Sequence, residues 1–116
     1  MTTKIQWLGH SCFYIESNSH KILIDPFLTG NPAASLKAAD LKADFILVSH
    51  GHGDHVGDSL EVLKATGATL VSNFEVCSWL NGKGVEKYSP GNHGGRIVPT
   101  DVFPPPSNDV LVTIIL

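Results

Sequence analysis

Four potential metal ligands fall within six residues of this chain and are separated only by glycines: His50, His52, Asp54 and His55. Imidazole nitrogens and carboxylate oxygens are ligands that zinc, manganese and iron accept. A short apolar run at 45–48 precedes the cluster, and a helical pattern over 58–66 follows it. The cluster is therefore predicted to lie on a loop at the carboxyl end of a strand, where open α/β sheets bind ligands. An ordinary polar loop is the alternative, but crowded imidazoles beside a carboxylate favour a metal site.

Three segments of the chain carry a family resemblance. Residues 49–55 resemble the H-x-H-x-D-H motif of the metallo-β-lactamase superfamily. Residues 5–13 (IQWLGHSCF) and 21–32 (KILIDPFLTGNP) are similar to segments of small bacterial metal-dependent hydrolases near the ascorbate-6-phosphate lactonases. The segments occur in the family's order, and the resemblance extends from around Lys4 to Arg96.

The resemblance implies a site with two divalent metal ions, either zinc or manganese. It assigns His50 and His52 to the first metal, and Asp54 and His55 to the second. Two metals about 3.5–4 Å apart hold a bridging water and lower its pKa, so that it attacks near neutral pH. Asp54 is also expected to act in catalysis by orienting that water. The expected substrate is a small molecule with a lactone, ester or phosphodiester bond.

The fold class predicted is α/β (α+β), as the N-terminal half of an αββα metallo-β-lactamase-like sandwich. The family completes its site with a third histidine, a bridging aspartate and a last histidine, all downstream. No histidine follows His93 here, and the later aspartates are Asp101 and Asp109. Residues 1–96 are therefore predicted to be the N-terminal half of such a domain, and 97–116 a divergent tail.

A half-sandwich leaves the inner face of its sheet in contact with water. Monomers rarely expose contiguous apolar patches beyond a few hundred Å². A homo-oligomer, association with a missing C-terminal half, or a cover formed by the chain's own tail is therefore expected. Two alternatives remain open: a non-catalytic metal-binding or interaction module, and an inactive fragment.

Four other side chains are candidates for smaller roles. Asp25 follows an apolar strand and either orients a ligating histidine or only forms a turn. His10, beside Gly9 at a strand end, either lines the mouth of the site or is a turn residue. His93 lies in a glycine-rich segment that could admit a ligand, but it lacks the preceding apolar strand of the family's later ligand. Cys12 has apolar neighbours, which favours packing over nucleophilic catalysis.

The order of elements follows from hydrophobic periodicity and turn residues. An antiparallel meander of three strands is predicted over 5–8, 12–16 and 21–25. A strand is predicted over 68–72, followed by a helix over 74–80 that Asn73 caps. Short strands are expected over 85–88 and 110–116, and Gly67 is expected to end the helix over 58–66.

Composition narrows the classes of partner. The net charge of −3 gives no support for binding nucleic acid or an anionic membrane. The N-terminus lacks an apolar signal-peptide core, and the apolar run at 110–116 is shorter than the ~20 residues that cross a bilayer. The two cysteines, Cys12 and Cys77, are expected to be buried reduced thiols, as in a cytoplasmic protein.

Overall fold

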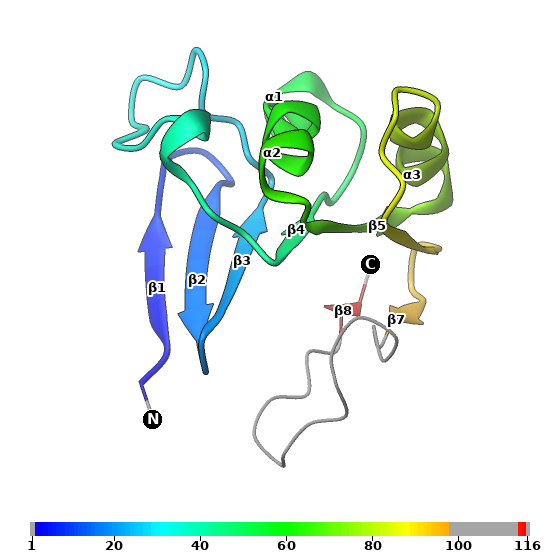
Figure 1. The fold of residues 1–116 in the computed structure, drawn as a ribbon, viewed down its shortest axis with the longest axis horizontal. Helices are drawn as coiled ribbons and strands as arrows, with labels where there is room; N and C mark the ends of the chain where they lie inside the picture. Colours follow the sequence, from blue (N-terminus) through cyan, green and yellow to red (C-terminus); the bar gives the residue numbers. More distant parts are fainter. Residues whose placement is uncertain (1, 98–113, 116) are drawn as a thin grey trace.

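A computed structural model describes residues 2–97 and 114–115 and shows one mixed six-stranded sheet with helices on one side (Figure 1). The strands lie side by side in chain order: β1 (Lys4–Trp7), β2 (Phe13–Ser17), β3 (His20–Ile24), β4 (Phe45–Leu47), β5 (Thr69–Asn73) and β6 (Tyr88–Gly91). The pairs β1–β2 and β2–β3 are antiparallel, whereas β3 to β6 are parallel. The predicted α/β class and the N-terminal meander are confirmed.

The helices predicted over 58–66 and 74–80 are present, but a further short helix at Gly53–Val56 places Asp54 and His55 in a helix and not on the predicted loop. The helices are the short 3-10 helix η1 (Ala38–Asp40), α1 (Gly53–Val56), α2 (Ser59–Thr66) and α3 (Phe74–Asn81). Gly67 ends α2 in the left-handed conformation, with φ 69°, which costs glycine little. Asn73 caps α3, because its side-chain oxygen accepts a hydrogen bond from Val76 N at 2.8 Å. Every helix in residues 2–97 is too short to cross a membrane.

One strand begins later than predicted. Val85 was expected in a strand over 85–88, but β6 starts at Tyr88. Val85 N donates a hydrogen bond to Leu80 O, and Asn81 Nδ2 donates one to Val85 O. The backbone of Val85 is therefore tied to the end of α3, and its buried side chain packs in the core under this connection.

The main core lies between the sheet and the helices. Its fully buried members include one residue from each of β3, β4 and β5, three residues next to strand ends, and residues on the inward faces of α2 and α3: Leu8, Cys12, Leu23, Ile46, Val48, Val62, Leu70, Cys77 and Leu80. Burying an aliphatic side chain of this size contributes roughly 1.5–3 kcal/mol. This packing fixes the carboxyl ends of β3 and β4, where the ligand cluster begins.

The opposite face of the sheet is also apolar. The strand register aligns Trp7, Phe13, Ile24, Leu47 and Val71 in one row across five strands. None of α1, α2 and α3 lies on this side (Figure 1). The β7 strand (Arg96–Ile97) pairs with β8 (Ile114–Ile115) and places Ile97 against the row near β5.

At the β1 end this face is open among the described residues. Trp7 is 60% exposed and Ile5 is 64% exposed. The predicted apolar face is therefore open at its β1 end, whereas near β5 it is covered and Val71 is 0% exposed. The predicted strand at 110–116 is described only at β8, and the proposed division at residue 96 remains a prediction.

Candidate metal centre

The predicted ligands lie where the sheet ends. Asp25 follows β3, and the segment from Ser49 to His52 follows β4 and leads directly into α1. Asp25 N donates a hydrogen bond to Leu47 O at 2.9 Å, which fastens the end of β3 to β4. The loop is thus placed at the carboxyl ends of parallel strands, as predicted.

The first two histidines point their ring nitrogens at one another. His50 Nε2 and His52 Nδ1 are 3.1 Å apart. The other ring nitrogen of His50, Nδ1, is 2.9 Å from Ser49 Oγ, so the hydroxyl fixes the orientation of the ring. With zinc–nitrogen bonds of about 2.0–2.1 Å, two donors at this separation subtend about 100° at one ion. The pair has the geometry of two ligands of a single metal.

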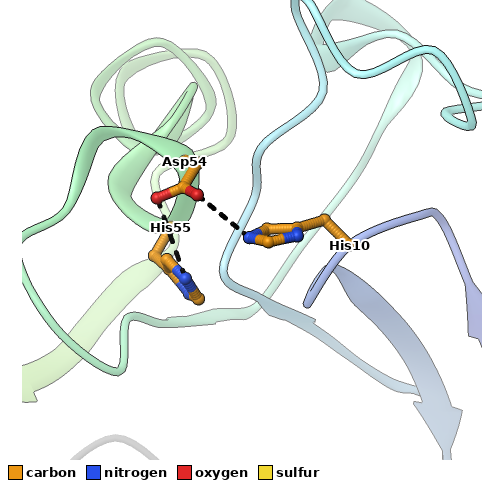
Figure 2. Close-up of side chains that lie close together, drawn as sticks. All are labelled: His10, Asp54 and His55. Atoms are coloured by element: carbon orange, nitrogen blue, oxygen red, sulfur yellow. Dashed lines mark ion pairs between the residues drawn. The ribbon is translucent and has the colours of Figure 1, made fainter.

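Asp54 lies between two imidazoles, those of His55 and His10 (Figure 2). Its Oδ1 is 3.8 Å from His55 Nε2, and its Oδ2 is 3.1 Å from His10 Nε2. Each of the three residues offers one ligand atom within 4.8 Å of the others. The structure therefore groups Asp54 and His55 as the resemblance implied, and it adds His10.

The carboxylate of Asp25 contacts Nδ1 of His55 and orients its ring. This carboxylate is buried, and it accepts hydrogen bonds from Ser49 N at 2.7 Å and from Ser49 Oγ at 2.6 Å. His55 Nδ1 is 2.8 Å from Asp25 Oδ2. Because an ionised carboxylate only accepts, His55 Nδ1 carries the proton and Nε2 keeps its lone pair toward Asp54. This carboxylate–histidine contact is typical of metal sites, and it favours the orienting role over a simple turn.

Asp25 also has strained backbone. Its φ is 45°, in the left-handed region that few non-glycine residues adopt, although aspartate, asparagine and histidine do so more often than most. Such strain costs roughly 1–3 kcal/mol and clusters at functional sites. The hydrogen bonds to Ser49 and His55 are what hold the side chain in this position.

The two groups are adjacent. The ring centroids of His50 and His55 are 4.0 Å apart, and those of His10 and His55 are 5.1 Å apart. The Asp54 side chain is half exposed, so the site opens to solvent. A set of imidazole nitrogens and one carboxylate, without a cation among them, fits divalent transition ions.

The remaining histidines do not join this group. His93 lies exposed in the turn after β6, and His20 begins β3 at the opposite end of that strand. His10, which was weighed as lining the site or as a turn residue, lies in the turn between β1 and β2 with its Nε2 3.1 Å from Asp54 Oδ2. The neighbouring Gly9 is the one local feature that pointed to His10. In the structure a Cβ on Gly9 would lie 2.7 Å from Ala33 Cβ, so only glycine lets this turn approach the next loop.

The surroundings of both cysteines favour a packing role over catalysis. Both are buried and unbonded to one another, as predicted. Burial, and then the charges of Asp25 and Asp58, raise the pKa of Cys12 to about 12. Burial raises the pKa of Cys77 to about 11. Neither thiol forms a thiolate near neutral pH, which agrees with a site that uses no cysteine nucleophile.

This chain is similar to proteins named as metal-dependent hydrolases. A metal-dependent hydrolase of Rhizobium meliloti is 55% identical over 96 residues, which cover 80% of this chain and 41% of that protein. The solved structure of Igni18, a metallo hydrolase of Ignicoccus hospitalis, has a TM-score of 0.78 and 36% identity, covering 89% of this chain and 46% of that one. A putative metal-dependent hydrolase of Parabacteroides distasonis shares the fold, with a TM-score of 0.64 and 21% identity, covering 84% of this chain and 40% of that one.

The chain thus spans less than half the length of these relatives. The six-stranded sheet and the loop with its histidines lie within residues 4–91. The profile of the beta-lactamase superfamily domain matches residues 4–102. This chain therefore belongs to the family described as the beta-lactamase superfamily domain.

Proposed function

We propose that this chain forms the metal-binding half of a metal-dependent hydrolase. His50 and His52 hold one divalent ion, and Asp54 and His55 hold a second, each zinc or manganese. The observation that carries the proposal is the facing pair of nitrogens at 3.1 Å, adjacent to an Asp54–His55 pair that Asp25 orients. The relatives named as metal-dependent hydrolases support the same chemistry.

The reaction proposed is hydrolysis of a small-molecule lactone, ester or phosphodiester. When bound by His50, His52, Asp54 and His55, divalent ions would supply a water of lowered pKa and polarise the carbonyl or phosphoryl oxygen. Asp54 would accept a hydrogen bond from that water and fix its direction. Asp25 keeps the proton of His55 on Nδ1, so that Nε2 stays available as a ligand atom. The half-exposed Asp54 leaves room for substrate on the solvent side.

We also propose that the open apolar face packs against a second sheet, supplied by the C-terminal half of the fold. The row through Trp7, Phe13 and Ile24 is continuous, and the relatives have more than half their length beyond the matched part. A stable contact of this kind buries on the order of 1,000 Å² or more. A homodimer is the alternative occupant, and light scattering at micromolar concentration separates the two. A monomer that unfolds cooperatively and binds no hydrophobic dye would contradict the proposal.

Metal content tests the ligand assignment directly. The double variant His52→Ala plus His55→Ala should lose most bound zinc or manganese, measured by elemental analysis after dialysis. His20→Ala is the matched control, because it removes a histidine at the far end of β3. Equal metal in the double variant and the control would contradict the assignment.

Turnover tests the hydrolase proposal. The chain alone is expected to cleave a lactone and a bis-aryl phosphodiester weakly, because loosely held groups that shift by about 1 Å lose ~10²-fold in rate. Co-expression with the C-terminal half of a relative should raise the rate, and Asp54→Ala should abolish that gain. Metal binding without turnover in either case would instead indicate a non-catalytic metal-binding module.

A further inference from the structure

We infer that His10 is a third protein ligand for the metal held by Asp54 and His55. The inference rests on the proposed metal site and adds a residue from the turn between β1 and β2. Catalytic zinc sites usually have three protein ligands. The loop after β4 alone supplies only two for this ion.

The distances suit one ion. A tetrahedral site with bonds of about 2.05 Å has donor–donor edges of about 3.3 Å. His10 Nε2 lies 3.1 Å from Asp54 Oδ2, and His55 Nε2 lies 3.8 Å from Asp54 Oδ1. The two distances end on different oxygens of Asp54, and one ligand atom from each of the three residues lies within 4.8 Å of the others, so a rotation of the Asp54 side chain would bring the donors onto one ion. Two imidazoles and one carboxylate also form the ligand set of known zinc hydrolase and iron sites.

The turn that carries His10 is rigid and specialised. Gly9 and His10 both have positive φ, 99° and 53°. Cys12 N donates to Gly9 O at 3.0 Å, and Trp7 Nε1 donates to His10 O at 2.9 Å. A non-glycine residue in this region costs energy and persists where the surroundings enforce it. The backbone thus aims the His10 ring at Asp54 before any ion arrives.

The competing explanation is a hydrogen bond. His10 could simply donate to Asp54 Oδ2 and position that carboxylate. Asparagine at residue 10 separates the two roles, since it tolerates positive φ and its amide donates a hydrogen bond, yet it is a poor ligand. Glycine at residue 10 also accepts the backbone conformation and removes both roles.

The experiment measures cobalt(II) binding in a His52→Ala background. This substitution disrupts the His50–His52 pair, so the binding that remains comes from the site at Asp54 and His55. Titration calorimetry gives affinity, and visible absorption gives the ligand field. His10→Gly and His10→Asn should each weaken cobalt(II) binding at least about tenfold, since removing even an outer-shell partner of a ligand costs 10–100-fold. Both should also change the visible bands, whereas His20→Ala should change neither property.

Each result has a definite meaning. Unchanged affinity and spectrum in His10→Gly would overturn the inference, provided that circular dichroism shows a folded chain. Full affinity in His10→Asn with a loss only in His10→Gly would also overturn it, because hydrogen bonding would then suffice. If the unaltered chain binds no cobalt(II), zinc or manganese, the proposed function itself fails, which is a different outcome from loss of the His10 effect alone.

Discussion

Asp25→Asn is the change that best tests how this site is organised. Asparagine has the same shape as aspartate and tolerates the φ of 45° at this position. It replaces one of two acceptor oxygens with a donor. Three donors now converge on the carboxylate, namely Ser49 N, Ser49 Oγ and His55 Nδ1. The amide can satisfy them only if some of those groups reverse their roles.

The cheapest arrangement keeps the amide oxygen on Ser49 N, where the backbone fixes the donor. The amide nitrogen then faces Ser49 Oγ and His55 Nδ1. The hydroxyl rotates to accept, but His55 must expose a lone pair on Nδ1 and move its proton to Nε2. Nε2 then points an N–H at Asp54 and at the proposed metal position.

The magnitudes follow from these contacts. Hydrogen bonds to charged groups contribute roughly 1.5–3 kcal/mol, against roughly 0.5–1.5 for neutral pairs. Two weakened bonds therefore lower the free energy of unfolding by about 2 kcal/mol. The altered His55 tautomer should weaken divalent-metal binding about 10–100-fold.

Three measurements check this reasoning: urea unfolding, cobalt(II) titration, and long-range ¹⁵N–¹H NMR of the imidazole tautomers. Asp58→Asn is the matched control, because Asp58 Oδ2 accepts from Leu28 N and Thr29 N without contacting a histidine. The control should lose stability but keep metal affinity. If His55 retains its proton on Nδ1 in Asp25→Asn, with cobalt(II) affinity within about twofold, the argument from tautomers is refuted.

Two further predictions concern stability. Gly57→Ala should lower the free energy of unfolding by about 2–4 kcal/mol, because the new Cβ meets Pro26 O at 2.4 Å in a positive-φ conformation; Gly53→Ala, whose Cβ meets nothing within 4 Å, is the control in urea unfolding. Cys12 and Cys77 should resist alkylation at pH 8 in the folded chain and react in urea. Their folded pKa values, about 12 and about 11, lie above the unfolded value of 9.0, so the stability they contribute is complete below pH 9 and is lost as pH rises toward 11–12. Urea midpoints between pH 8 and pH 10.5 should therefore fall, and Cys12→Val should reduce the fall.

Local signals in the sequence predicted most of the fold. Gly67 and Asn73 act within a few residues, through a left-handed conformation and a side-chain cap, so their effects are readable without tertiary structure. The apolar run at 45–48 and the glycine-spaced loop after it likewise need only local chain geometry. The grouping of Asp54 with His55 follows from their adjacency on α1.

Features that depend on contacts between distant segments were harder to predict from the sequence. Val85 looked like a strand residue, but its backbone hydrogen bonds go to the end of α3. The contact of His10 with Asp54 joins residues far apart in sequence, and it depends on the approach of the β1–β2 turn to α1. Such contacts are set by sheet order and register, which periodicity alone does not determine.

The open face and the candidate site share parts of the chain, which links their energetics. Trp7 is in the apolar row, and its indole N–H donates to the carbonyl of His10. Ile24 and Leu47, in the same row, lie directly before Asp25 and shortly before Ser49. A second sheet that covers this row therefore restrains the segments that position His10, Asp25 and Ser49. Any effect of the proposed second sheet on metal affinity would, by reciprocity, be matched by an equal effect of bound metal on the association of the two sheets.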